Sequence, residues 1–185
     1  MAKYELEREL GEGQFGVTYL AKDTVTEELV ALKVLKHPQL ALDDFRDEVK
    51  ALMQFNHPNI IRYKDCNYFD ATPAQRLFYL ATEFADGGNL EGRAGRITLA
   101  TAVDHVIQIL TGLAECHRQH RLHADIRPAN IFVTRGTVKI GDFGVSMEST
   151  NTVAGPILGT PSYWPRKSTR LTFVLRSGQI CGRWA

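Results

Sequence analysis

The hydrophobic period changes partway along the chain, and this change most constrains the fold. Up to about residue 84, short segments rich in β-branched and aromatic residues alternate with turn-like or charged stretches, which is typical of an antiparallel sheet. The expected strands lie around residues 17–21, 30–35, 60–69 and 77–84. One helix, from about Asp43 to Phe55, interrupts them.

After a polar, glycine-rich run at residues 85–95 the period becomes helical. We expect a helix from Leu99 to His120 whose apolar residues form one stripe: Val103, Val106, Ile107, Leu110, Leu113, Ala114 and His117. Two short strands are expected at residues 131–133 and 137–140, around a turn at Arg135 and Gly136. The run at residues 85–95 is therefore interpreted as the crossing between two lobes.

Composition argues against several function classes. The chain has 22 basic and 21 acidic residues, a formal charge of +1, so no global field draws it to nucleic acid or to a charged membrane. Its three cysteines lie far apart, which favours a reducing compartment over a disulfide framework. No signal-peptide region is present, and no window approaches the roughly 18 apolar residues of a membrane span. We expect a cytoplasmic protein with no membrane segment in this chain.

A glycine-rich run, GEGQFGV, lies between two expected strands. Gly11, Gly13 and Gly16 have no Cβ, so a hairpin that carries them can approach a polyphosphate closely. On its own, the run is equally well explained as an ordinary glycine-rich hairpin. A dinucleotide-binding fingerprint is disfavoured because a helix would have to follow.

Two charges face the expected core of the first lobe. Lys33 lies in the apolar strand VALK, and Glu48 falls on the inward stripe of the following helix. A charge in apolar surroundings is costly without a partner, so we expect an ion pair between these two residues. A purely structural pair without catalytic duty remains an alternative.

Two segments after the long helix carry residue types that phosphoryl transfer needs. HADIRPAN places a carboxylate at Asp125, a guanidinium at Arg127 and an amide at Asn130, which suit a proton acceptor, a stabilising cation and a metal ligand. KIGDFG then supplies Asp142, a hard oxygen ligand suited to Mg²⁺. A solvated polar loop and a simple turn are the respective alternatives.

Together and in this order, the four segments resemble the signature set of the protein kinase family over residues 4–163. The resemblance implies an α+β, two-lobed fold. Residues 1–85 would form the ATP-binding N-lobe, with a five-stranded antiparallel sheet and one helix, and residues 86–163 a mainly helical, partial C-lobe. DIRPAN and GTPSY are similar to the serine/threonine group, so the expected substrate is a protein Ser or Thr hydroxyl, with ATP and Mg²⁺ as cofactors.

The resemblance also implies a role for each site residue. Asp125 would accept the substrate proton, with Arg127 beside it in the catalytic loop. Lys33, held by Glu48, would reach the α and β phosphates. Asn130 and Asp142 would hold the metal. The other ATP-binding residues would be Leu10, Gly11, Gly13, Gly16, Val17, Ala31, the gatekeeper Thr82, Glu83, Ala85 and Phe132.

Leu52, His123 and Phe143 fall on the family's hydrophobic regulatory stack, which favours a packing role for His123. Two catalytic-loop positions depart from the family pattern: Ala124 replaces the usual arginine, and Arg127 replaces the usual lysine. The first change removes the cation that receives an activation-loop phosphate, so we expect little dependence on that phosphorylation.

The largest departure is residues 164–185. After GTPSY the family continues Met-Ala-Pro-Glu-Val, whereas this chain reads WPRKS. Deleting one base from codons for the family segment yields Trp-Pro-Arg-Lys-Ser, so we expect an out-of-frame, non-homologous tail, with a genuinely divergent tail as the alternative. Without the helices that follow in the family, the apolar stripe at residues 99–120 would stay exposed. Activity of this truncated chain would then be impaired.

Two other function classes stay open. A pseudokinase-like module would bind nucleotide or partner proteins without catalysis. Lys33, Asp125, Asn130 and Asp142 are intact and argue against it, whereas the tail argues for it. A small-molecule phosphotransferase shares some of these signals, but the combination of GEGQFGV, DFG and GTPSY makes it the weaker interpretation.

Overall fold

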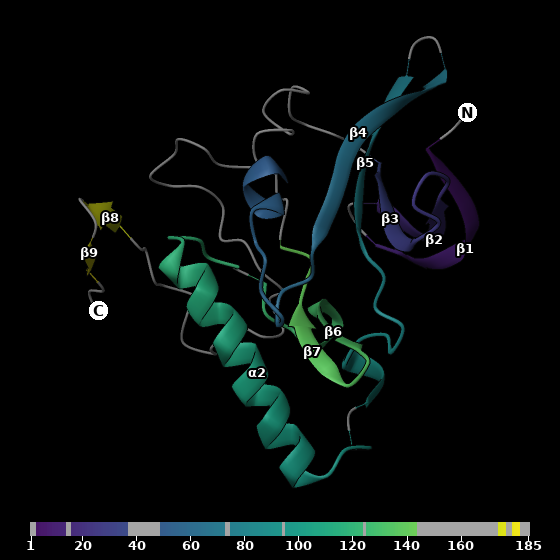
Figure 1. Ribbon diagram of the computed structural model, residues 1–185. Coiled ribbons are helices and arrows are strands. Elements are labelled where there is room, and N and C mark those ends of the chain that lie inside the picture. The colour runs from purple at the N-terminus through teal and green to yellow at the C-terminus, as the bar shows by residue number, and fades with distance from the viewer. Residues whose placement is uncertain are drawn as a thin grey trace.

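The first part of the chain forms a five-stranded antiparallel sheet in the order β1-β2-β3-β5-β4 (Figure 1). Its strands are β1 (Tyr4–Glu12), β2 (Gly16–Asp23), β3 (Leu29–Leu35), β4 (Tyr63–Thr72) and β5 (Gln75–Glu83). Residues 49–53 are helical, which confirms part of the helix expected at residues 43–55; it ends at Met53, two residues earlier than predicted. This computed structural model describes residues 3–13, 16–36, 49–72, 75–93, 95–123, 125–143, 174–176 and 179–181.

The second part contains one long helix beside a small hairpin (Figure 1). Its elements are η1 (Glu91–Arg93), α2 (Leu99–Arg118), η2 (Pro128–Asn130), β6 (Ile131–Thr134) and β7 (Thr137–Ile140). Arg135 and Gly136 adopt positive φ angles of 47° and 82°, as a tight hairpin turn requires. The predicted strands and turn are therefore confirmed. Near the C-terminus, β8 (Val174–Arg176) pairs with β9 (Gln179–Cys181).

Backbone pairing across the two lobes corrects one predicted strand. The segment expected at residues 60–69 begins as β4 only at Tyr63. Ile60 instead forms a bridge with Ile140 of β7, and the Ile61 amide donates to the Ile140 carbonyl at 2.8 Å. These apolar residues are buried, so the sequence pattern identified a core segment but not its partner.

The buried side chain of Asn59 reinforces the same contact. Its Nδ2 donates to the Val138 carbonyl at 2.9 Å and to Gln108 Oε1 on α2 at 3.2 Å. Gln108 Oε1 also accepts from the Val138 amide at 2.7 Å. Because an unpaired buried amide is costly, these bonds fix Asn59, α2 and β7 to one another.

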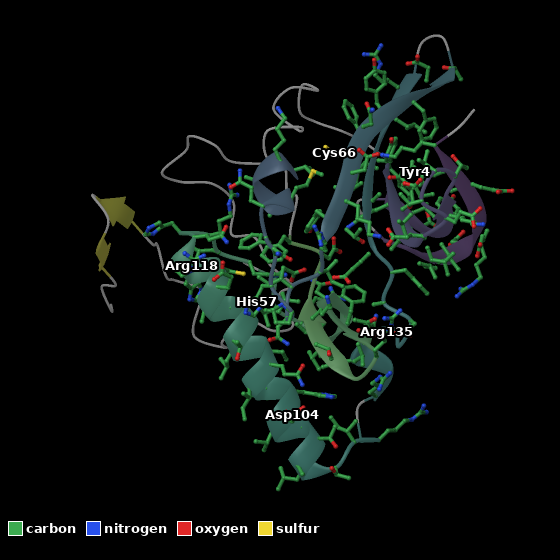
Figure 2. The ribbon with its side chains drawn as sticks, viewed as in Figure 1. Tyr4, His57, Cys66, Asp104, Arg118 and Arg135 are labelled. Carbon is green, nitrogen blue, oxygen red and sulfur yellow. The ribbon has the colours of Figure 1, made fainter. Side chains whose placement is uncertain are left out.

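Local signals explain the ends of α2, which Figure 2 shows with Asp104 and Arg118 labelled along it. Thr98 Oγ1 accepts a hydrogen bond from the Thr101 amide at 3.2 Å, which caps the first turn. The helix was predicted to reach His120 but ends at Arg118. His120 has a φ of 57°, a left-handed conformation that cannot continue a helix.

The apolar stripe of α2 is largely exposed, as expected. Val103, Val106, Ile107 and Leu110 keep between 51% and 59% of their surface accessible. The opposite face packs inward through His105, Gly112 and Cys116. A Cβ on Gly112 would lie 2.7 Å from the Asn59 carbonyl oxygen. The close approach of α2 to the backbone of Asn59 therefore depends on the absence of a side chain at Gly112. Hydrophobic periodicity did not identify this requirement.

We predict that polar substitution of this stripe leaves stability intact. The combination Val103→Glu, Ile107→Lys and Leu110→Gln should change the free energy of unfolding by less than about 0.5 kcal/mol, because exposed sites contribute little. It should also reduce self-association, measured by light scattering. Gly112→Ala, on the packed face, is the control and should lower the melting temperature. Equal destabilisation by both would contradict the assignment of the two faces.

Candidate active site

A cleft of about 360 Å³ opens between the sheet and the β6–β7 hairpin. Residues of both lobes line this cleft, so it forms only where the two lobes pack against each other. The predicted site residues on its walls are Leu10, Gly11, Ala31, Lys33, Thr82, Glu83, Ala85, Phe132 and Asp142. Val17 is not among the lining residues; its neighbour Thr18 is.

Irregular pairing of β1 brings an unpredicted cation to this cleft. Leu6 pairs with Ala21, and Arg8 pairs with the next residue of β2, Leu20. The residue between them in β1, Glu7, therefore has no partner of its own in β2 and forms a bulge. An inserted residue reverses which face the following side chains occupy. Arg8 consequently lines the cleft. Strict alternation along the strand could not have identified it.

The three glycines of GEGQFGV have different surroundings. Added Cβ atoms at Gly11 or Gly13 would meet no atom closer than 3.9 Å. A Cβ on Gly16 would lie 2.2 Å from the Val34 carbonyl oxygen of β3. Gly16 is therefore required by the packing of β2 on β3, whereas Gly11 and Gly13 leave space above the cleft.

Lys33 and Asp142 meet inside the cleft. The Nζ atom of Lys33 lies 2.5 Å from Oδ1 of Asp142, and their side chains are 22% and 43% exposed. Asp142 has a φ of 51°, a strained conformation for a residue other than glycine. The expected partner Glu48 lies outside the described residues, so the Lys33–Glu48 pair stays a prediction.

The catalytic-loop residues form a compact cluster beside Asp142. Asn130 Nδ2 donates to both Oδ2 and the carbonyl of Asp125, at 2.8 and 2.9 Å. The Gly141 amide donates to the Asn130 carbonyl at 2.9 Å. The chain thus brings together Asp125, Asn130 and Asp142, three residues that the sequence predicted to share one site.

Phe143 packs into the core, as predicted for the regulatory stack. Its ring centroid lies 4.6 Å from that of His123 and 5.4 Å from that of Phe55. Leu52 and Tyr63 belong to the same buried cluster. The contacts of Phe143 with Phe55 and Tyr63 were not predicted from the sequence.

His123 is a packing residue that links the two catalytic segments. Its Nε2 lies 2.9 Å from the Gly141 carbonyl, and its Nδ1 accepts from the Asp125 amide at 3.3 Å. Burial lowers the pKa of His123 despite these contacts, because desolvation disfavours the charged imidazolium. A neutral ring that donates from Nε2 and accepts at Nδ1 fits both bonds.

A shielded ion pair fixes the segment that joins the lobes. Glu83 Oε1 accepts from Lys139 Nζ at 2.7 Å and from the Arg62 amide at 2.8 Å. The Glu83 amide donates to the Arg62 carbonyl at 2.9 Å. The predicted gatekeeper, Thr82, donates a hydrogen bond from Oγ1 to the Ala31 carbonyl at 3.5 Å.

Some predicted site residues do not line the cleft: Gly13, Gly16, Val17, Asp125, Arg127 and Asn130. One Nη atom of Arg127 lies 4.0 Å from Glu91 Oε1. Ala124 lies outside the described residues, as do the activation segment and GTPSY.

The oxygen donors suit one small divalent cation. Asp142 supplies a carboxylate, and Asn130, whose Nδ2 donates to Asp125, has an amide oxygen as the other polar atom of its side chain. Magnesium prefers one or two such protein ligands together with phosphate oxygens. Within the described residues there is no group of three His, Cys, Asp or Glu side chains that could hold a metal ion.

A cleft between a five-stranded antiparallel lobe and a helical lobe, with a lysine paired to an aspartate beside an aspartate–asparagine loop, is typical of phosphotransferases of the protein kinase class. The sequence profile described as the protein kinase domain matches residues 4–168. The chain belongs to the protein kinase family. Members of this family generally use ATP and Mg²⁺ and act on proteins.

Curated relatives include proteins that are named as kinases. The chain is 34% identical to "Serine/threonine-protein kinase 1" of Arabidopsis thaliana over 88% of this chain and 20% of the relative. It is 35% identical to "Aurora kinase" of Dictyostelium discoideum over 88% and 43%. It is 40% identical to "Cell division control protein 2 homolog 3" of Trypanosoma brucei brucei over 74% and 45%. The chain therefore spans less than half the length of these relatives.

Among the described residues, none of the helices is both long and apolar enough to cross a membrane.

The different surroundings of the glycines predict separable effects. Gly16→Ala should lower the free energy of unfolding by about 1–3 kcal/mol, since its Cβ would collide with backbone. Gly11→Ala should leave stability within about 0.5 kcal/mol of the parent and weaken nucleotide binding instead. Denaturant unfolding and calorimetric titration with ATP measure the two quantities. A Gly16→Ala protein as stable as the Gly11→Ala protein would contradict this distinction.

Proposed function

We propose that this chain is the catalytic part of a serine/threonine protein kinase, which transfers the γ-phosphoryl group of ATP to a protein hydroxyl with Mg²⁺. The observation that carries the proposal is the pairing of Lys33 with Asp142 in the cleft, next to the hydrogen-bonded Asp125 and Asn130, which are joined to Asp142 through the Gly141 amide. Phosphoryl transfer needs a phosphate-binding cation, metal ligands and an oriented proton acceptor, and these residues supply all three.

The nucleotide base fits the apolar part of the cleft. Leu10 and Ala31 line it from the sheet and Phe132 from the β6–β7 hairpin, so a flat ring can lie between them. Glu83 and Ala85 line the joining segment and would offer backbone groups to the base. Val17 is a further predicted contact that does not line the cleft in this structure.

The phosphates extend towards Lys33 and the glycine-rich hairpin. Lys33 supplies a positive charge, and the open space above Gly11 and Gly13 admits phosphate oxygens near the backbone. When Mg²⁺ is bound, Asp142 and Asn130 would hold it, and it would neutralise charge on the phosphates. The Lys33–Asp142 ion pair keeps both side chains aimed at this position before the nucleotide arrives.

Asp125 accepts the proton of the attacking hydroxyl. As the acceptor oxygen bonds to the γ-phosphorus, the bond from that phosphorus to the β,γ-bridging oxygen breaks, and ADP leaves. The Asn130 amide holds Oδ2 of Asp125, so the carboxylate is oriented before the substrate binds. Arg127, in the same loop, is proposed to steady the transferring group, although it contacts Glu91 in this structure.

The division of the chain at residues 85/86 and 163/164 also stays a proposal. The β5 strand ends at Glu83, which supports the first boundary. The family profile extends to residue 168, five residues beyond the second. We retain an out-of-frame tail over residues 164–185 as the explanation for WPRKS.

Transfer of radiolabelled phosphate from ATP to casein tests the proposed activity. Asp125→Asn should lower the transfer rate by about 10²- to 10⁴-fold, the usual effect of removing a general base, while ATP affinity stays close to that of the parent. Glu27→Gln is the control, since Glu27 lies in the β2–β3 turn and its side chain is 79% exposed.

Three outcomes would contradict the proposed activity. Equal transfer by the parent and by Asp125→Asn would exclude Asp125 as the proton acceptor. ATP binding without any transfer would favour the pseudokinase-like module. Phosphorylation of a small alcohol but not of casein would favour a small-molecule phosphotransferase.

A further inference from the structure

The strand β1 covers the cleft but is held at few places. It lies at one edge of the sheet and, among the described strands, pairs with β2. Tyr4 is partly buried, whereas every residue from Glu5 to Glu12 is exposed. Two register shifts interrupt the pairing with β2. The partly buried side-chain anchorage of β1 is therefore at its first residue, whereas at its last residue the exposed side chain of Glu12 forms an ion pair with Lys36.

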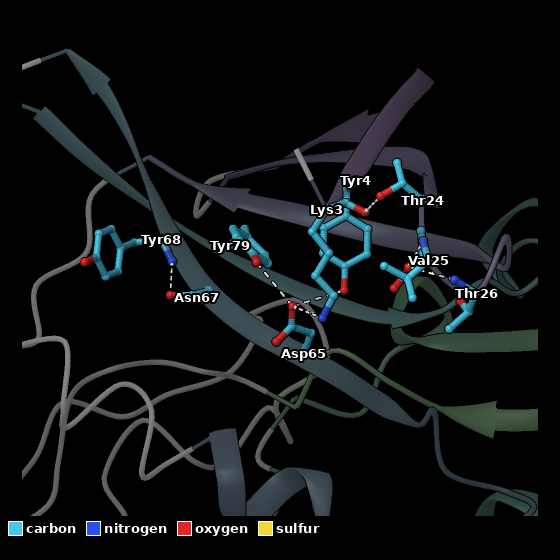
Figure 3. Close-up of polar contacts among 10 residues, drawn as sticks. Lys3, Tyr4, Thr24, Val25, Thr26, Asp65, Asn67, Tyr68 and Tyr79 are labelled. Carbon is cyan, nitrogen blue, oxygen red and sulfur yellow. Dashed lines mark hydrogen bonds and ion pairs between the residues drawn. The ribbon is translucent and has the colours of Figure 1, made fainter. Parts of the chain in front are cut away.

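The anchor is a carboxylate on the opposite edge of the sheet, shown in Figure 3. Oδ2 of Asp65, on β4, accepts from the hydroxyl of Tyr4 at 3.1 Å and from that of Tyr79 at 3.2 Å. The Nζ atom of Lys3 lies 2.8 Å from the same oxygen. The sheet is coiled enough to bring its two edges together at this one atom.

The surroundings of Asp65 strengthen these bonds. Its side chain is only 20% exposed, and hydrogen bonds to a shielded charge are stronger than neutral ones. The rings of Tyr4 and Tyr79 meet edge to face at 5.7 Å. Burial, aided by Asp65, raises the pKa of both phenols, so both hydroxyls remain protonated donors at physiological pH.

The same end of β1 is tied to the β2–β3 turn. The amide and the hydroxyl of Thr24 both donate to the Lys3 carbonyl, at 2.9 and 3.1 Å. The other end of β1 carries Leu10 and Gly11, which line the cleft. Between the two ends lies the irregularity at Glu7, where β1 exchanges faces. The shielded contacts of β1 thus lie at the Tyr4 end, while the end over the cleft is tied by the solvent-exposed pair of Glu12 with Lys36.

We propose that Asp65 is a positioning residue for nucleotide binding: by holding Tyr4 it fixes β1, and through β1 it sets where Leu10 and Gly11 lie over the cleft. The proposal rests on the proposed nucleotide site but adds a residue that does not line it. Losing the anchor frees β1 to open locally, which lowers the fraction of protein that is ready to bind.

Two variants and a matched control test this role. Asp65→Asn removes the charge with little change of shape, and Tyr4→Phe removes one hydroxyl but keeps the ring. Asp70→Asn is the control, because Asp70 lies on the same strand with a side chain that is 62% exposed and paired with Arg76. Amide hydrogen exchange and calorimetric titration with Mg²⁺ and ATP are measured on the full chain.

For Asp65→Asn we expect exchange across residues 5–12 to become about tenfold faster and the Kd for Mg²⁺–ATP to rise about three- to tenfold, consistent with losing hydrogen bonds to a charge. Tyr4→Phe should produce smaller changes in the same direction. Exchange in α2 and β7, and all values for Asp70→Asn, should match the parent. If Asp65→Asn fails to fold, Tyr4→Phe decides alone.

Unchanged exchange in β1, or an unchanged Kd, would overturn the positioning role. Faster exchange in every element would also overturn it, since that marks global destabilisation rather than local opening. A parent protein that binds no Mg²⁺–ATP would overturn the proposed function instead. Hydrogen exchange in β1 is measured without ligand. It would therefore still show whether Asp65 anchors the strand, even if the parent protein bound no Mg²⁺–ATP.

Discussion

The active cleft depends on the pairing of residues 59–61 with Ile140. Two backbone hydrogen bonds and the side chain of Asn59 join the loop before β4 to β7. Because β7 leads directly into Gly141, Asp142 and Phe143, this joint decides where Asp142 enters the cleft. Without it, Lys33 on the sheet and Asp142 on the hairpin would have no fixed separation.

Three consecutive residues after β7 then serve three different contacts. Gly141 bonds to Asn130 and His123 through its backbone, Asp142 reaches Lys33, and Phe143 packs into the core. An added Cβ at Gly141 would lie 2.7 Å from Ile61, so the lobes approach closely here. The core packing of Phe143, the left-handed backbone of Asp142 and the position of the Asp142 carboxylate therefore depend on one another. Packing that holds a polar side chain in place is typical of pre-organised sites.

Sequence reasoning identified the chemistry better than the packing. Lys33, Asp125, Asn130 and Asp142 were predictable because phosphoryl transfer needs few residue types in a fixed order, and the family resemblance placed them together. Arg8 was not predictable, because it reaches the cleft through an irregularity in β1 that leaves no mark in hydrophobic alternation.

The packing partners of the buried segments could not be predicted from the sequence either. Ile60 and Ile61 have the composition of a strand but pair across the lobes. The inward face of α2 uses His105, Gly112 and Cys116 while its more apolar stripe stays exposed. Periodicity finds apolar faces, but tertiary contacts decide which of them are covered. The role of Glu48 and the division of the C-terminal segment remain predictions.

The most direct test of the central claim is the magnesium dependence of ATP affinity in Asp142→Asn. The account predicts that Mg²⁺ tightens ATP binding to the parent by at least about tenfold, roughly 1.4 kcal/mol, and that this gain disappears in the variant. An Asp142→Asn protein that retains the full magnesium effect would contradict the assignment of Asp142 as the metal ligand of the cleft.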